Sequence, residues 1–566
     1  MASAESQEHG SEWRLGLEPG ESVQGTAAPP HREHSRDLGR ERLERPLQVV
    51  TVEHLGWSLI TLYALGSRLL GLGVRPLDGA EARHAIAAFN LAGIGPHVPV
   101  AAYPGGAGWI DALTAGLFNF TGAGDCAART IYALAGLLLI AMAFEMRHYV
   151  GRAGALGLAA MFSLSPALTW YSRSAAPALA GAALALATIS IFMALRANPS
   201  RRRAAMLGVA GGLTAAADVS GLATVAIFAA ALVPLGIWDA LTVRNLKLRI
   251  QVWLDRYGAH LATVILAAAA AWAASRLALH DGFAPDRLSA AAYSVIAGAG
   301  RPGFAAGLKF YLPTAGLYEF SIVLIGVVGA VIILGLQMRS RFAFWCLLWT
   351  AGAIAWGLWT PAREPARIVA MLVPAAVIGA IGLDWLHRTE IWKYIWMPLA
   401  VIAAGSLYAG VNADFINGVP NPSEAPWARH GNLFRTEGAT LPDLPGVAGA
   451  AQAGLPVDIA TVGYIGSVAP QIRWYLRNLR PLNEASAASV IAVEEAPAPT
   501  VSSESKRWNF AYSESWRPDF TGINAAQVTR FLATGELWGA TRQRTATIIR
   551  RPVGPAAPTV ILTPPG

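Results

Sequence analysis

Eleven apolar segments separated by short basic loops constrain this chain more than any other feature of its sequence. Most of them reach the roughly 17 to 25 residues that the hydrocarbon core of a bilayer requires. Charged residues make up only 14% of the 566 residues, whereas a soluble domain carries about a quarter. The sequence therefore predicts an α-helical polytopic membrane protein with about eleven transmembrane helices, at residues 55–72, 128–146, 154–170, 175–195, 204–217, 222–238, 261–279, 313–336, 342–359, 368–385 and 394–411.

The charges between these segments predict the orientation of the chain. If the N-terminus is cytoplasmic and every segment crosses, each of the five inner loops is basic, as the positive-inside rule demands. The odd number of segments then places everything after residue 411 outside the cell. We expect a multi-pass protein of the plasma membrane, whose inner loops carry Arg147 and Arg152; Arg196, Arg201, Arg202 and Arg203; Arg244, Lys247, Arg249 and Arg256; Arg339 and Arg341; and Arg388 and Lys393.

The net charge of +8 by itself would also fit a nucleic-acid-binding protein. The basic residues are spread over short loops, however, and do not gather with aromatic residues on one folded face. We therefore expect membrane lipids, and no nucleic acid, among the partners. The two cysteines, Cys126 and Cys346, fall at opposite faces of the predicted topology, so no disulfide framework or cysteine metal site follows from them.

The composition divides the chain into three parts, residues 1–50, 51–411 and 412–566. Residues 1–50 are rich in Glu, Arg, Gly and Pro without an apolar period, which is typical of a disordered tail, here on the cytoplasmic side. Residues 51–411 form the transmembrane part. Its first outer loop, 73–127, contains two helical stretches, 81–91 and 108–120, that are too short or too broken to span and so belong in the membrane interface. A second outer loop covers 280–312.

Residues 412–566 predict a small extracytoplasmic α/β domain with a frayed end. Pro, Asn and Ser accumulate at 417–445, and short β-like runs then alternate with amphipathic stretches. We expect strands at 457–462, 489–493 and 545–550, and helices at 468–479 and 524–537.

The first candidate site comes directly after the first apolar segment, in Arg75-Pro-Leu-Asp-Gly-Ala-Glu-Ala-Arg-His84. Glu81 and His84 are three residues apart and so share one face of a helix. Asp78 precedes that helix, where it can act as its cap. Ionisable groups at a membrane face are costly when buried and cheap when solvated. One interpretation is a capped, solvated interfacial helix; the other is an acidic base with a helper in a membrane-surface cleft.

This segment resembles the first outer loop of the multi-spanning GT-C glycosyltransferases, which use lipid-phosphate sugar donors. The likeness is greatest to the branch of flippase-activity-associated proteins, relatives of the protein O-mannosyltransferases. Further motifs resemble that branch in the same order, so the likeness runs from about residue 55 to 550. The matching residues are Pro76, Leu77, Glu81, Ala82, His84 and Ala85; Ser165-Pro166 with Trp170-Tyr171-Ser172-Arg173; Lys309-Phe-Tyr-Leu-Pro with Leu317-Tyr318-Glu319; and Arg473-Trp474-Tyr475-Leu476-Arg477.

The resemblance implies a hexosyltransferase that moves a sugar from a polyprenyl-phosphate-linked donor to a protein, lipid or glycan acceptor at the outer face. Such a transfer needs a carboxylate to take the acceptor's proton, which makes Asp78 and Glu81 the predicted catalytic residues. His84 and Glu319 are predicted to bind substrate. No cofactor follows with certainty, and a requirement for a divalent cation is left open.

Two further predicted substrate-binding residues lie in the short turn between the third and fourth segments. Arg173 is placed to stabilise the leaving phosphate, although an Arg at this depth also snorkels to the interface. Tyr171, with Trp170 beside it, can stack on a sugar, although aromatic residues are ordinary at membrane interfaces.

The departures from the family pattern keep other functions open. Ala80 stands where the family has the acidic residue presumed to be its base, and Ser174 to Pro177 replace an Arg-x-Asp. The main alternative is a catalytically degenerate, sugar-lipid-binding or flippase-associated partner in a cell-surface glycan pathway. A transporter or lipid flippase is the third hypothesis, but such proteins often show paired repeats, and the two halves of this chain show none.

Overall fold

The computed structural model describes residues 51–99, 108–241, 246–277, 304–336, 340–359, 365–411, 439–456, 460–494, 496, 499, 502–518, 524–534 and 539–552. By compactness the chain divides into residues 1–54 and 55–566, and the account below concerns the second unit. The predicted tail of residues 1–50 lies outside the described residues.

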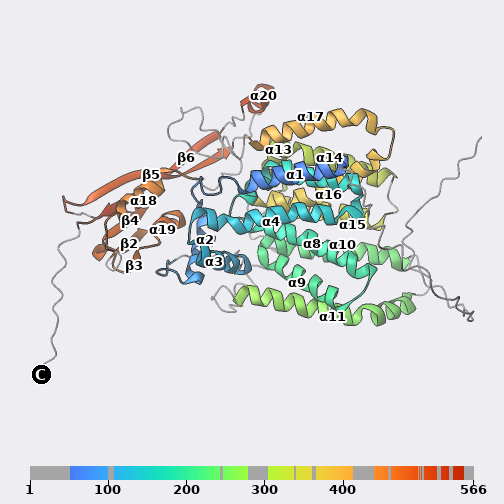
Figure 1. Cartoon of the computed structure of the whole chain (residues 1–566), viewed down its shortest axis with the longest axis horizontal. Helices are drawn as coiled ribbons and strands as arrows, with labels where there is room; N and C mark the ends of the chain where they lie inside the picture. Colours follow the sequence, from blue (N-terminus) through green and yellow to red (C-terminus); the bar gives the residue numbers. More distant parts are fainter. Residues whose placement is uncertain are drawn as a thin grey trace, which may run out of the picture. The chain divides into compact units, whose positions relative to one another are not determined.

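Each predicted apolar segment coincides with a helix or with a bent pair of helices (Figure 1). Among the described residues, six helices are long and apolar enough to cross a membrane, or up to eight spans if each bent pair counts as one. The number eleven stays a prediction. The helices of this part are α1 (Val52–Leu69), α4 (Asp125–Glu145), α5 (Arg147–Val150), α6 (Arg152–Leu164), α7 (Pro166–Ser172), α8 (Pro177–Ala197), α9 (Arg201–Ala217), α10 (Val219–Leu241), α11 (Leu246–Leu277), α13 (Phe304–Tyr318), α14 (Phe320–Leu336), α15 (Arg341–Trp359), the short η2 (Pro365–Arg367), α16 (Ile368–His387) and α17 (Trp392–Val411).

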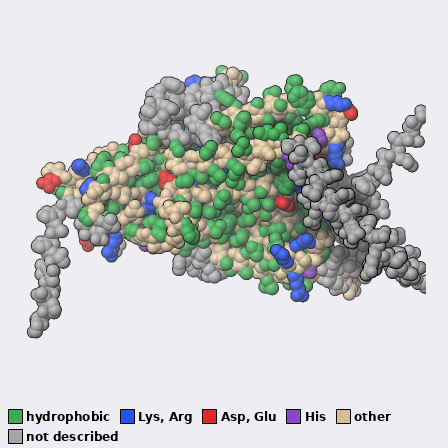
Figure 2. Space-filling model, in the orientation of Figure 1, with side chains coloured by type: hydrophobic (Ala, Val, Ile, Leu, Met, Phe, Trp, Pro, Cys, Tyr) green, Lys and Arg blue, Asp and Glu red, His purple; other side chains and the backbone are tan. Residues whose placement is uncertain are grey.

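Hydrophobic side chains also cover the outside of these helices (Figure 2). Leu62 of α1, Val331 of α14 and Val401 of α17 are each about two-thirds exposed, at 69%, 65% and 67%. In water an apolar surface of this extent would drive association, whereas in a bilayer it contacts lipid. Of the six helices long enough to cross a membrane, α16 is the most buried, and it packs against α6, α14 and α15. The chain is a multi-pass membrane protein.

Two of the apolar segments bend sharply at a polar residue. The hydroxyl of Ser165 caps α7 by accepting a hydrogen bond from the Leu168 backbone N–H at 3.1 Å, and Pro166 occupies the first turn, where a missing N–H costs nothing. The axes of α6 and α7 therefore meet at 64°. Helices α13 and α14 meet at 99° around Glu319. Helix α13 begins at Phe304, inside the predicted outer loop 280–312, whose residues 280–303 lie outside the described residues.

Residues 73–127, the predicted first outer loop, contain both helices that the sequence predicts, α2 (Gly79–Ala92) and α3 (Gly108–Thr121). Helix α2 begins at the Asp78 cap and ends at Gly93, whose φ of 63° is the left-handed conformation that glycine adopts without strain. The two helices pack against each other through a core that includes Ile86, Phe89 and Phe118.

The C-terminal part, predicted to be the soluble domain, is a six-stranded mixed sheet with helices, as the sequence predicts in outline. The strand order is β1-β5-β6-β4-β2-β3; β2 pairs in parallel with β3 and β4, and the other pairs are antiparallel. The central strand β4 is buried along its whole length, as expected of a strand covered on both faces. The elements are β1 (Ala439–Thr440), α18 (Asp443–Gln452), β2 (Thr461–Gly466), α19 (Pro470–Tyr475), β3 (Arg480–Leu482), η7 (Ala485–Ala487), β4 (Val490–Glu494), β5 (Lys506–Pro518), α20 (Ala525–Thr534) and β6 (Gly539–Arg550).

The predicted strand 489–493 corresponds to β4, and 545–550 lies inside β6. The predicted strand 457–462 overlaps the start of β2 at 461–462, and its residues 457–459 lie outside the described residues. The longest strand, β5, is absent from the sequence prediction, although Trp508, Phe510 and Tyr512 alternate there with polar residues at the period of two that indicates a strand.

Candidate active site

The carboxylate of Glu81 lies at the centre of a buried network between α2, α4 and the turn after α7. Its side chain is 2% exposed. Two nitrogens of Arg129 donate hydrogen bonds to the carboxylate of Glu81, Nη2 at 2.6 Å and Nε at 2.8 Å. Nη2 of Arg75 donates a third at 3.2 Å. The backbone N–H groups of Asp78 and Ala175 donate at 2.9 and 3.0 Å. Five N–H donors thus occupy the two oxygens of Glu81, which fixes α2 against the transmembrane helices.

Asp78 differs from Glu81, although the two residues form one reciprocal capping box. One carboxylate oxygen of Asp78 accepts the Glu81 backbone N–H at 2.8 Å. Its other oxygen has no hydrogen-bond partner among the described residues, and the side chain is only half-buried. The outer loop therefore holds one carboxylate that is fully occupied and one that keeps an oxygen available.

The pKa values of the two carboxyl groups move in opposite directions. Burial, together with the neighbouring Glu81 carboxylate, raises the pKa of Asp78 to about 6. Burial alone would also raise the pKa of Glu81, but the guanidinium groups of Arg129 and Arg75 outweigh it and lower that pKa to about 2. Near neutral pH Glu81 is a fixed anion, whereas Asp78 exchanges protons in the range in which a general base works best.

Arg75 connects this network to the turn that follows α7. Its guanidinium lies over the Trp170 ring, 4.1 Å from the ring centre, and donates to the Ser174 hydroxyl at 2.7 Å. A cation held over an aromatic face and beside one carboxylate is well ordered. Arg75 is therefore a positive group of defined position next to Asp78.

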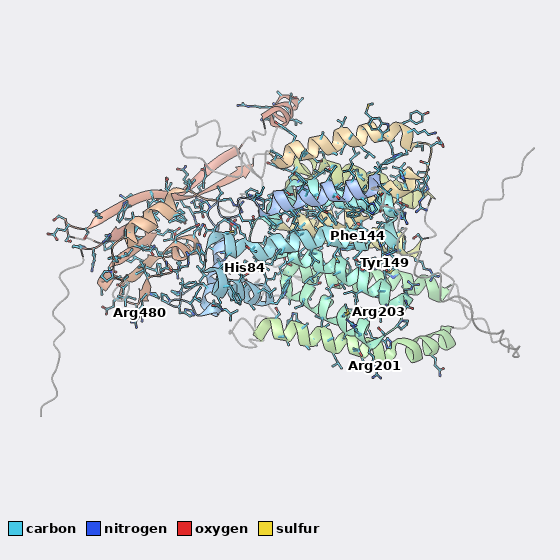
Figure 3. All side chains as sticks on the ribbon, in the orientation of Figure 1. His84, Phe144, Tyr149, Arg201, Arg203 and Arg480 are labelled. Carbon is cyan, nitrogen blue, oxygen red and sulfur yellow. The ribbon has the colours of Figure 1, made fainter. Side chains whose placement is uncertain are left out.

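His84, labelled in Figure 3, lies one turn further along α2 and pairs with an acid from α3. Its Nδ1 is 3.2 Å from Oδ1 of Asp111, and both side chains are almost completely buried. The second oxygen of Asp111 and the hydroxyl of Tyr132 are buried without a hydrogen-bond partner among the described residues. The structure thus brings His84 beside the Glu81 network, in a buried polar layer of its own.

The short helix α7 carries the next two predicted residues. Tyr171 is 5% exposed, which is deeper than an interfacial aromatic residue needs to be. Arg173 follows at the end of the helix, where its Nη1 donates to the carbonyls of Ser67 at 2.8 Å and Leu70 at 2.6 Å. It thereby binds the last turn of α1, whose free carbonyls need donors.

Glu319 lies at the other end of α7 and is completely buried. One of its oxygens accepts the Ser165 hydroxyl at 2.9 Å and the Ala167 backbone N–H at 2.6 Å, so it caps α7 from the break between α13 and α14. Its second oxygen has no partner among the described residues. Glu319 and Arg173 therefore lie at opposite ends of the short helix α7. The structure does not place Glu319 in the network around Glu81 and Asp78.

The soluble domain docks on the outer loop through the motif that begins at Arg473. Trp474 is fully buried between Phe89 and Phe118, and its indole N–H donates to Asp125 at 2.8 Å. The Tyr475 hydroxyl donates to Asp125 at 2.6 Å and accepts the Leu77 backbone N–H at 3.0 Å. Burial, and after it the Asp125 carboxylate, raises the pKa of the Tyr475 hydroxyl well above its usual range, so the phenol stays protonated.

Two further contacts place this domain beside the start of α2. The Thr440 hydroxyl donates to the Leu77 carbonyl at 2.5 Å. A Cβ atom at Gly79 would come within 3.3 Å of the Gln471 side chain. The glycine next to Asp78 thus allows the soluble domain to approach the half-buried carboxylate closely.

Four residues that make these contacts were not among the predicted site residues: Arg75, Asp111, Asp125 and Arg129. A signal for Arg129 exists in the sequence, because an arginine in the first turns of a predicted span is costly unless it is paired. Asp111 carries the same signal, as an acid in an otherwise apolar stretch. Their partners were not predictable, because the contacts join residues 27 and 48 positions apart.

No group of three or more His, Cys, Asp or Glu side chains in the described part of the chain is arranged to hold a metal ion. A requirement for a divalent cation stays a prediction, and no step below depends on one.

Comparison with known proteins leaves the family open and defines the fold. No family model and no curated protein matches the chain. Among solved structures, ArnT from Cupriavidus metallidurans bound to undecaprenyl phosphate is similar over 88% of this chain and 99% of its own, with a TM-score of 0.55 and 14% identity. The apo form of ArnT gives 0.54, with 14% identity over 88% of this chain and 98% of its own. The Archaeoglobus fulgidus oligosaccharyltransferase, with zinc and sulfate, reaches 0.47 at 13% identity, over 78% and 68%.

The two ArnT structures, whose TM-scores exceed 0.5, are GT-C glycosyltransferases. The chain therefore has the GT-C-like fold that the sequence predicts, with its helical membrane part and its small C-terminal sheet domain. Membership of the flippase-activity-associated branch stays a prediction.

Proposed function

We propose that this protein is a membrane glycosyltransferase that moves a sugar from a polyprenyl-phosphate-linked donor to a hydroxyl of a protein, lipid or glycan acceptor at the outer face of the plasma membrane. The fold supports the general kind of function, because the ArnT structure that it resembles over almost its full length binds undecaprenyl phosphate. At 14% identity this likeness extends to the fold alone, so the chemistry is argued from the residues of this chain.

The observation that carries the proposal is the difference between the two carboxylates of the capping box. Asp78 has an available oxygen and a pKa raised to about 6, so it suits a base that takes the acceptor's proton. Glu81 has no oxygen to offer, because five donors occupy it. Of the two predicted catalytic residues we assign the base to Asp78 and a positioning role to Glu81.

The cationic groups around Asp78 suit the leaving phosphate. Arg75 lies beside the carboxylate pair, and Arg173, which binds the carbonyls at the end of α1, is the other predicted phosphate-binding group. Arg129 is committed to Glu81. Preorganised positive groups in a partly buried site stabilise the charge that develops on a departing phosphate better than water does. His84, Tyr171 and Glu319 remain predicted substrate-binding groups.

The transfer step balances with these groups. The acceptor oxygen forms a bond to the anomeric carbon of the sugar as its proton passes to the carboxylate of Asp78. The bond from the anomeric carbon to the phosphate oxygen breaks, and the polyprenyl phosphate leaves with the electron pair beside Arg75 and Arg173. The soluble domain, docked next to Gly79 through Gln471 and Tyr475, is in place to present the acceptor.

The test is sugar transfer in reconstituted membranes with radiolabelled polyprenyl-phosphate hexoses as donors. Asp78→Asn is the informative variant, because Asn caps a helix as well as Asp does but cannot act as a base. We expect transfer to fall by about 10²- to 10⁴-fold, with donor binding retained. The control is Glu390→Gln, which changes an 85% exposed carboxylate outside this site and should transfer normally. Normal transfer by Asp78→Asn would exclude Asp78 as the base.

Ala80 favours a second candidate function. It stands next to Glu81, where the resembled family has its presumed base, so the chain would be a sugar-lipid-binding partner without catalysis. In that case the wild type binds polyprenyl-phosphate hexoses but transfers none of them, and Asp78→Asn changes neither property.

A further inference from the structure

A second site, separate from the outer loop, lies inside the helical part. A cavity of about 680 Å³ lies among α8, α9, α10, α11 and α15. That volume is typical of small-ligand sites. Its wall is almost wholly apolar and includes Phe192, Phe228, Trp272 and Trp345, whereas its charged or titratable side chains are Arg196 and His260. An apolar cavity of this size excludes water and accepts hydrocarbon.

Glycines of α9 shape this cavity. A Cβ atom at Gly208 or Gly212 would come within 2.4 Å of a carbonyl oxygen of α11, so these two positions let the helices pack closely. A Cβ atom at Gly211, which also lines the cavity, would meet nothing within 4 Å. Gly211 therefore faces the open space itself.

The cavity has a polar end and an apolar end. His260 and Trp272 line it twelve residues apart on α11, which at about 1.5 Å per residue is about 18 Å. The hydrocarbon core of a bilayer is about 30 Å thick, so the cavity is about one leaflet deep. Leu232 and Leu261 line it too and are each 42% exposed, which places an opening toward lipid between α10 and α11.

The polar end carries a surplus of positive charge. Arg196 lines the cavity and is exposed, and α9 begins nearby with the exposed Arg201 and Arg202. Figure 3 shows Arg201 and Arg203 at the opposite end of the helical part from His84. The cavity therefore opens at the basic end of the bundle, away from the candidate active site.

From this geometry we infer that the cavity binds an acyl chain of an anionic phospholipid from the leaflet at the basic end of the bundle. The chain lies along α11 from His260 toward Trp272, and the phosphate contacts Arg196. The apolar wall selects hydrocarbon, the depth selects a chain from a single leaflet, and the arginines select a negative headgroup. This site does not depend on the proposed transferase activity.

The experiment is native mass spectrometry of the full chain, released from mixed vesicles of phosphatidylglycerol and phosphatidylcholine with the same acyl chains. The wild type is expected to retain phosphatidylglycerol in preference. Gly211→Leu fills the cavity, and we expect it to lower that retention by about tenfold or more, because each displaced methylene weakens binding. The matched control is Gly335→Leu on α14, where a Cβ atom also meets nothing within 4 Å and no part of the cavity changes.

A second variant tests the headgroup contact. Arg196→Gln should lose the preference for phosphatidylglycerol while it still retains phospholipid. Equal retention by Gly211→Leu and Gly335→Leu would overturn the inference, because both lipids would then lie on the outer surface. Displacement of phosphatidylglycerol by added polyprenyl phosphate, one for one and lost in Gly211→Leu, would overturn it in favour of a prenyl chain.

Discussion

The two ends of the helical part use the same charged residue types for different purposes. At the predicted outer loop, Glu81 and Arg129 are buried and joined by hydrogen bonds of 2.6 and 2.8 Å. At the basic end, Arg388 and Lys393 are 71% and 70% exposed, and their ion pairs with Asp384 and Glu390 join neighbouring turns. Burying a charge costs solvation free energy, which an oppositely charged partner and hydrogen bonds must offset. An exposed charge keeps its solvation by water. The first set can therefore fix a reacting geometry, and the second is the kind of charge from which the sequence predicts the orientation of the chain.

The largest expected contrast is in stability. Glu81→Gln removes the carboxylate that neutralises a fully buried Arg129, and leaving such a charge unpaired costs about 3–5 kcal/mol. Glu390→Gln breaks an exposed pair, which is worth less than about 1 kcal/mol. Thermal unfolding in nanodiscs compares the two variants. Equal unfolding temperatures would mean that the Glu81 network does not hold the outer loop.

The docking of the soluble domain gives a contrast of similar size. Trp474→Ala empties a fully buried site between α2 and α3, and such truncations cost about 3–5 kcal/mol. The comparison is Trp396→Ala on α17, whose side chain is 53% exposed. Limited proteolysis after residue 411 should become faster in the first variant alone. Unchanged proteolysis of Trp474→Ala would show that other contacts hold the domain.

The sequence predicts the helices and the basic loops of these two regions, but not the contacts between side chains that are far apart in the sequence. Apolar length is a local property, so the helices at the apolar segments and both helices of residues 73–127 were predictable, whereas the number of spans stays a prediction. The pairing of Glu81 with Arg129 and of Trp474 with Asp125 was not, since these contacts join residues 48 and 349 positions apart. A capped helix at Asp78 was predictable from its spacing, but not that Glu81 would be buried rather than solvated.

Titration of Asp78 gives the next contrast, in rate. Its protonated form cannot accept a proton, so transfer requires the carboxylate and should rise with pH through its pKa of about 6. Below that pH, kcat/KM is expected to fall by about tenfold per unit. Glu81, with its pKa lowered to about 2, stays ionised throughout and adds no step. A rate that is level from pH 5 to 8 would exclude Asp78 as the base.

The smallest effect comes from a single hydroxyl. Tyr475→Phe removes the group that bonds both Leu77 and Asp125 and leaves buried polar partners without it, at a cost of about 1–3 kcal/mol. Tyr394→Phe, at an 80% exposed position of α17, should leave the free energy of unfolding unchanged. If the two variants unfold alike, the hydroxyl of Tyr475 contributes nothing to docking.

The most direct test of the account measures two properties of two variants side by side: the rate of sugar transfer and the unfolding temperature of Asp78→Asn and Glu81→Gln. The account predicts that Asp78→Asn unfolds like the wild type and loses transfer, whereas Glu81→Gln unfolds at a clearly lower temperature. Transfer by Asp78→Asn at the rate of the wild type would contradict it, and so would a Glu81→Gln variant that is fully stable but inactive.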